Sequence, residues 1–177
     1  MTFEDIYTTY IKRDGAVELL KWLKSTDFFT APGSTRFHDC HAGGLADHSA
    51  RVFYEFTRLL NAYKLNVSAE TAAIVTLLHD VCKANCYKVE MRNKKNEHGQ
   101  WIQVPVYTFK EDFAYGGHGS KSVYLIQKFM KLTDEEAVCI NCHMGPENGN
   151  FAVNDAYRAY PLAFLVHTAD MASTIEF

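Results

Sequence analysis

The chain has 177 residues, of which 47% are hydrophobic and 22% charged, and its formal net charge is −3. A chain of this length and composition can bury one substantial core, so we expect a single folded domain over residues 1–177 rather than a disordered segment. The negative charge argues against an extended nucleic-acid-binding surface, and no apolar run approaches the roughly 20 residues that a membrane span needs.

The compartment is indicated by the first residues and by the cysteines. The first twelve residues are interrupted by acidic side chains, so we expect neither a signal peptide nor a membrane anchor. Five cysteines, an odd number, predict free thiols and a cytoplasmic protein. A zinc ribbon is disfavoured, because ribbon cysteines lie on tight turns whereas these fall mostly on predicted helices. Its candidate ligands would be Cys82, Cys86, Cys139 and Cys142.

The first predicted helix begins with Asp14 as its N-cap, and its apolar side chains Val17, Leu20 and Leu23 recur at three- and four-residue spacing. This pattern is typical of a helix that packs one face on a core. Residues 27–44 contain a proline and three glycines without periodicity, so they predict a loop before the next helix.

The second predicted helix carries an inward-facing histidine. From Leu45 onward, apolar residues recur on one face through Leu59, and His48 lies on the same face. Ser68 is placed to cap a third helix, which we expect to continue through His79 to Lys83.

The next segment has the only strand signal in the chain. Residues 87–91 and 101–109 are rich in β-branched and aromatic side chains, and the polar stretch between them contains a glycine, as in a β-hairpin. We expect a small hairpin insertion at about 87–109 in a fold that is otherwise all-α.

Three more helices are predicted after the hairpin. One begins at Ser120, and the next begins with a capping box formed by Thr133 and Glu136 and ends near His143. Pro161 suits the first turn of the last helix, on which Asp170 occupies the core-facing side.

Several side chains that bind metals fall on the inward faces or at the ends of three predicted helices. They are His48, His79, Asp80 and Asp170. Alone, a buried histidine is more often a hydrogen-bonded core residue than a ligand. An aspartate at a helix C-terminus, however, opposes the helix dipole, which favours a nearby cation. Since these residues would meet if the helices pack together, they predict a metal site. His118 and His143 lie at helix boundaries from which they can reach it.

In this order the residues resemble the H…HD…D signature of the HD metal-dependent phosphohydrolase superfamily. Residues 79–83 (HDVCK) resemble its HD-hydrophobic-Gly-Lys motif, with Cys82 in place of glycine, and residues 43–48 (GGLADH) are similar to its GGL-x-x-H helix start. His118 and His143, each beside a glycine, resemble the two additional histidines of the six-ligand, dinuclear branch, which includes bacterial proteins related to a 3′-to-5′ exoribonuclease. The resemblance runs from about residue 37 to 171.

The resemblance implies an HD-domain helical bundle that holds one or two divalent transition metals, two being favoured. The implied ligands are His48, His79, Asp80, His118, His143 and Asp170. Four neutral imidazoles and two carboxylates bring a charge of −2 against +4 for two ions, so the centre stays positive and attracts phosphate. Nitrogen-rich ligation favours Mn, Fe, Co, Ni or Zn. The implied reaction is hydrolysis of a phosphate ester by metal-activated hydroxide, without a covalent intermediate.

The expected roles of the other site residues follow from the same resemblance. Asp80 would bridge the metals, and Lys83, four residues after His79 on the predicted helix face, would contact the phosphate, making these two the expected catalytic residues. Three further candidate substrate contacts are His38, Arg51 and Lys121.

Two other functions remain open at this point. Some six-ligand HD proteins resemble this chain yet are di-iron oxygenases that cleave C–P or C–C bonds with the same ligands. A non-enzymatic nucleotide sensor would lack a ligand, whereas all six positions are filled here. The expected partner is a small phosphorylated substrate or a short nucleotide, a monoester or short phosphodiester, with no membrane. An oligomer is compatible with the sequence.

Overall fold

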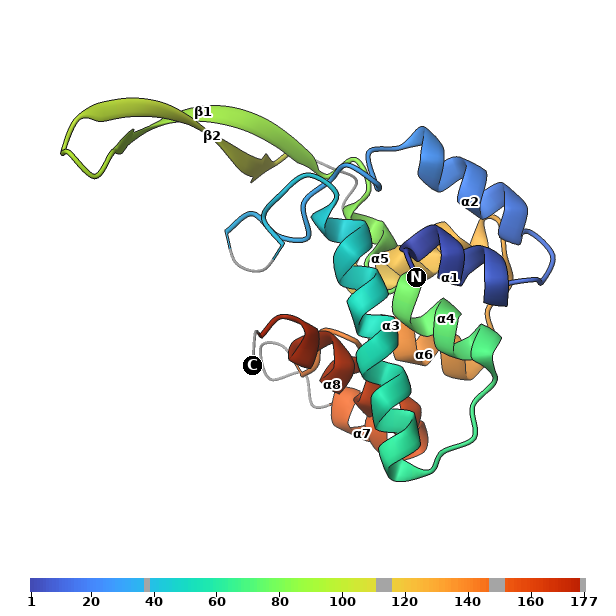
Figure 1. Cartoon of the computed structure of the whole chain (residues 1–177). Coiled ribbons are helices and arrows are strands. Elements are labelled where there is room, and N and C mark those ends of the chain that lie inside the picture. The colour runs from blue at the N-terminus through green and yellow to red at the C-terminus, as the bar shows by residue number, and fades with distance from the viewer. Residues whose placement is uncertain (37–38, 111–115, 147–151, 176–177) are drawn as a thin grey trace.

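The computed structural model describes residues 1–36, 39–110, 116–146 and 152–175 (Figure 1). Its helices are α1 (Phe3–Tyr10), α2 (Ala16–Ser25), α3 (Gly44–Tyr63), α4 (Ala69–Leu77), α5 (His118–Gln127), α6 (Asp134–Asn141), α7 (Ala152–Ala159) and α8 (Pro161–Ser173). The other elements are a short 3-10 helix, η1 (Val81–Lys83), and strands β1 (Tyr87–Lys95) and β2 (Trp101–Phe109). No helix in the described ranges has the length and apolar character that crossing a membrane requires.

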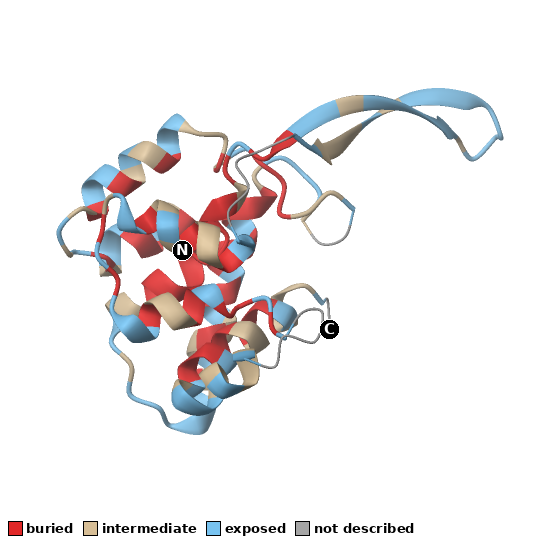
Figure 2. Ribbon diagram, turned by 180° about the vertical axis from the view of Figure 1, so that it is seen from behind, coloured by how far each residue is buried: buried red, intermediate tan, exposed pale blue. Residues whose placement is uncertain are grey.

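The expected all-α class is wrong, because the chain combines its helices with a two-stranded antiparallel sheet and is therefore mixed. The strands form a full ladder in which Tyr87 pairs with Phe109 and Lys95 with Trp101. β-Branched and aromatic residues favour this extended structure. The hairpin projects away from the helical body (Figure 1), and most of its residues are exposed (Figure 2).

Helix α4 lies at the centre of the helical body. Its residues 72–77 are all buried, and the helix packs against α1, α3, α6 and α8. A helix that is apolar on every side must be surrounded by other elements. Helix α3 instead buries one stripe, which includes Leu45, His48, Val52 and Phe56, as the sequence predicts. The inward face of α3 therefore brings His48 toward α4 and α8.

Several helix ends follow the predicted capping. Ser68 accepts a hydrogen bond from the Thr71 N–H at 3.0 Å at the start of α4, and Thr133 and Glu136 form the capping box of α6. Pro161 is the first residue of α8. These local signals fix where the helices that carry site residues begin.

The start of α2 differs from the prediction, and α1 and α7 were not predicted at all. Gly15, with φ of 85°, is the N-cap of α2 in place of Asp14, and Val17 is 61% exposed although Leu19 and Leu23 are buried. A Cβ on Gly15 would lie 1.8 Å from the carbonyl oxygen of Phe129. The close approach to this long-range neighbour selects glycine for the cap.

Candidate metal centre

The candidate centre begins where α4 ends. The predicted continuation of this helix through Lys83 is wrong, because α4 ends at Leu77 and the chain turns through His79 and Asp80 into η1. The His79 Nδ1–H donates to the Thr76 carbonyl at 2.7 Å. In a continuing helix, that carbonyl would accept from the backbone N–H of residue 80. The side chain of His79 therefore ends the helix.

Two histidines are fixed in the same way at two helix ends. His79 Nδ1 lies 2.7 Å from the Thr76 carbonyl oxygen, and His143 Nδ1 lies 2.7 Å from that of Ile140 after α6. A carbonyl only accepts, so each Nδ1 carries the hydrogen. In the neutral ring each Nε2 then presents a lone pair, and both rings are fully buried. This arrangement orients histidines in metal sites.

Both lone pairs face the carboxylate of Asp80. His79 Nε2 lies 3.4 Å from Asp80 Oδ2, and His143 Nε2 lies 3.5 Å from Asp80 Oδ1. Among the described residues, both Nε2 atoms and Asp80 Oδ1 are buried without a hydrogen-bond partner. Such atoms are rare in folded proteins. Two ligands of one ion, each about 2.1 Å from it, lie at most about 4.2 Å apart. The three residues therefore fit a divalent ion.

A second group of ligands lies next to the first. His48 Nε2 is 3.0 Å from Asp170 Oδ1, and His79 Nε2 is 3.7 Å from the same oxygen. Burial raises the pKa of Asp170, but the His48 hydrogen bond and the charges of His79 and His143 outweigh it and lower the pKa to about 2. Asp170 is therefore ionised at neutral pH and available to a cation.

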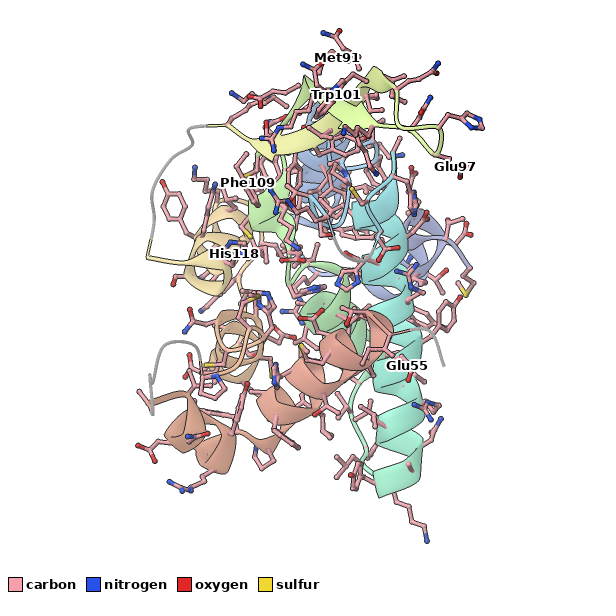
Figure 3. All side chains as sticks on the ribbon, turned by 90° about the vertical axis from the view of Figure 1, so that its left-hand side faces the viewer. Glu55, Met91, Glu97, Trp101, Phe109 and His118 are labelled. Carbon is pink, nitrogen blue, oxygen red and sulfur yellow. The ribbon has the colours of Figure 1, made fainter. Side chains whose placement is uncertain are left out.

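A third group joins the start of α5 to Asp80. Ligand atoms of Asp80, Cys82 and His118 lie within 4.8 Å of one another. His118 is exposed, and Figure 3 labels it at the first turn of α5. The three groups overlap at His79 and Asp80, so the structure brings all six sequence-predicted ligands into one region. Cys82 is a seventh donor that we did not predict as a ligand.

The electrostatics of the centre are dominated by Asp80 and Lys83. Lys83 Nζ lies 2.7 Å from Asp80 Oδ2 and donates to the Gly33 carbonyl at 2.9 Å. Burial opposes both charges, but the ammonium holds the pKa of Asp80 well below its ordinary value, with a further contribution from His79. Burial also lowers the pKa of Lys83, yet Asp80 raises it more. The pair is ionised at neutral pH.

The predicted substrate contacts differ in where the structure places them. Lys83 reaches Asp80 from η1 rather than from the helix face of His79. The exposed Arg51 guanidinium donates to Asp39, and Lys121 Nζ lies 3.6 Å from Cys86 Sγ. His38 lies outside the described residues.

Besides Cys82, two residues near the centre are not predicted from the sequence. Asp39 Oδ2 lies 3.7 Å from His48 Nδ1, and the Asp39 side chain is only 7% exposed. Its position in an aperiodic loop gives no sequence signal. His167 Nδ1 donates to the His143 carbonyl at 2.7 Å. Its place one turn before Asp170 on α8 is a signal that could have found it.

Searches of protein-family models, of curated proteins and of solved structures found no match to this chain.

Proposed function

We propose that this protein is a metal-dependent phosphohydrolase of the HD superfamily that cleaves a small phosphate ester. One observation carries the proposal. In their neutral forms, His79 and His143 turn their Nε2 lone pairs toward the Asp80 carboxylate in a buried site, without hydrogen-bond partners among the described residues. A cation between them removes the repulsion, and we favour two ions per chain. The proposed ligands are His48, His79, Asp80, His118, His143 and Asp170.

When bound, divalent transition metals supply Lewis acidity, which lowers the pKa of water to about 7 and neutralises charge on a phosphoryl oxygen. The chain's own residues position this chemistry. Asp80 has one carboxylate oxygen toward His79 and the other toward His143, so both of its oxygens would be available to hold metal. Lys83 keeps a positive charge beside Asp80, where its ammonium can contact a phosphate oxygen of the substrate.

The substrate class follows from charge. The proposed ligands carry −2 against +4 for two ions, which attracts a phosphate, whereas the whole chain has a net charge of −3. A small phosphorylated molecule or a short nucleotide suits this combination better than a long nucleic acid. Arg51 and Lys121 are proposed as outer substrate contacts. All five cysteines are free, which favours a reducing compartment such as the cytoplasm.

The test is hydrolysis by metal-loaded protein. Chelated protein is reconstituted with Mn, Fe, Co, Ni or Zn and assayed on phosphomonoesters, phosphodiesters and nucleotides. We expect release of phosphate or of the ester alcohol with metal, and loss of this activity in His79→Ala. His98→Ala is the matched control, because His98 lies in the hairpin turn and is exposed. Oxygen consumption by the iron form, without cleavage of any phosphate ester, would contradict the hydrolase proposal. It would support instead an oxygenase that cleaves a C–P or C–C bond.

A further inference from the structure

We propose that Cys82 is a ligand of the second metal ion, so that this ion is held by sulfur from Cys82 as well as by Asp80 and His118. The inference rests on the proposed metal-dependent function and deepens it, because the six ligands of that proposal contain only nitrogen and oxygen donors. It predicts an asymmetric centre with one sulfur-ligated and one sulfur-free ion.

The distances support coordination by all three residues. Cys82 Sγ, a ring nitrogen of His118 and a carboxylate oxygen of Asp80 lie within 4.8 Å of one another. Metal–sulfur and metal–nitrogen bonds of about 2.3 and 2.1 Å allow separations up to about 4.4 Å. A contraction of a few tenths of an ångström therefore suffices. Asp80 Oδ1, the oxygen that also faces His143, is buried without a hydrogen-bond partner among the described residues, as expected for an atom that awaits a cation.

Contacts between η1 and α5 keep the backbone of Cys82 close to the helix that carries His118. The backbone N–H of Cys82 donates to Ser122 Oγ at 3.1 Å, which ties η1 to α5. Ser122 follows His118 by four residues, so both lie on one face of α5. A Cβ on Gly119 would lie 2.2 Å from the Asn141 carbonyl oxygen, so the start of α5 is packed directly on the end of α6. These contacts hold the start of α5, where His118 lies, beside η1.

A buried cysteine often serves only as a small apolar side chain. The surroundings of Cys82 are different: burial and then the charge of Asp80 raise the pKa of its thiol to about 12, so the thiol lies within electrostatic range of the ionised pair of Asp80 and Lys83. Cys86 provides the contrast. Its thiol donates to the Cys82 carbonyl at 2.9 Å, and it belongs to none of the three groups of metal-type ligands found among the described residues.

Sulfur ligation changes the charge and the metal preference of the centre. As the sulfur–metal bond forms, the thiol releases its proton to solvent, so the ligands carry −3 against +4 and the centre keeps a charge of +1. Phosphate binding is preserved. A thiolate also favours Zn, Co or Fe over Mn, since it is a softer donor than oxygen.

The direct test is X-ray absorption spectroscopy of the zinc-loaded full chain. We expect a sulfur scatterer at about 2.3 Å in the wild type, its loss in Cys82→Ser and its retention in Cys86→Ser. The wild-type spectrum needs no variant to fold. Bound zinc with only nitrogen and oxygen neighbours would overturn the role of Cys82 while leaving the proposed function intact. A sulfur signal that persists in Cys82→Ser would also overturn it. Failure of the wild type to bind zinc would overturn the role of Cys82, whereas failure to bind any of Mn, Fe, Co, Ni and Zn would reject both proposals.

Discussion

The Nε2 atom of His143 lies 3.5 Å from Oδ1 of Asp80, while Nδ1 of the same ring is committed to the Ile140 carbonyl. The ring cannot turn to offer its N–H to Asp80 without losing the carbonyl bond. In the metal-free protein with neutral histidines, two atoms that both carry lone pairs therefore face each other in a buried site. This arrangement is unfavourable until a cation lies between them.

The first prediction is that metal stabilises the fold through Asp80. Zinc or cobalt at 100 times its Kd contributes about 2.7 kcal/mol, which corresponds to a rise in Tm of about 5–10 °C for a chain of this size. Asp80→Asn should lose most of that rise, because the amide brings no charge to the ion. Asp155→Asn is the control, since Asp155 is exposed on α7. Equal metal-induced shifts in both variants would exclude Asp80 as a ligand.

The second prediction concerns pH. Burial lowers the pKa of His79, but Asp80 and Asp170 raise it more, so its pKa in the metal-free protein lies above the ordinary value of 6.5. Protonated His79 therefore stabilises the metal-free fold fully below about pH 6.5, and this stability is lost as pH rises through the raised pKa. Metal binding requires the neutral ring, so the affinity falls as pH drops through the same pKa.

Thermal unfolding of metal-free protein between about pH 6 and about pH 8 measures this effect. We expect Tm to fall as pH rises in the wild type, and to change less in His79→Gln. A Tm that rises over this range in the wild type would show that His79 is not the group that is stabilised by protonation.

The third prediction tests the packing around α6. The Arg13 guanidinium donates to both carboxylate oxygens of Glu136 at 2.7 and 2.9 Å, and the Glu136 side chain is fully buried. Arg13→Ala leaves this carboxylate without its charge partner, and we expect a loss of about 3 kcal/mol. Arg58→Ala removes the exposed pair with Glu55 and should cost under about 0.5 kcal/mol. Denaturant unfolding of both variants makes the comparison. Similar losses would contradict the assigned role of Arg13.

The fourth prediction concerns the approach of α5 to α6. Gly119→Ala should push the start of α5 away from Asn141, because the new Cβ would lie 2.2 Å from its carbonyl oxygen. His118 then moves, and metal content should fall from about two ions per chain to about one. Gly99→Ala is the control: it has open space around it in the hairpin turn, and its φ of 75° should cost only about 1 kcal/mol without loss of metal. Unchanged metal content in Gly119→Ala would contradict the proposed role of His118 as a metal ligand.

The sequence predicted those parts of the site that follow from local periodicity. The buried position of His48 could be predicted because the apolar residues of α3 recur on one face of the helix. The buried position of Asp170 could be predicted because the apolar residues of α8 recur at four-residue steps. The hairpin was also predicted, although the all-α class was wrong. The caps Ser68 and Thr133 could be predicted from the sequence, because capping involves only residues three apart.

The missed features depend on contacts between distant segments. The true end of α4 is set by the side chain of His79, which competes with the backbone for the Thr76 carbonyl. Cys82 reaches the centre because η1 is tied to Ser122 on another helix. Asp39 reaches His48 only through the path of a loop. Periodicity carries no information about such contacts.

The metal content of freshly isolated protein, purified without any chelator, is the most direct test of the proposed metal centre. Elemental analysis should give about two transition-metal ions per chain, drawn from Mn, Fe, Co, Ni and Zn. A combined content well below half an equivalent, in protein that is folded by circular dichroism, would contradict the assignment of the His79, Asp80 and His143 cluster as a metal centre.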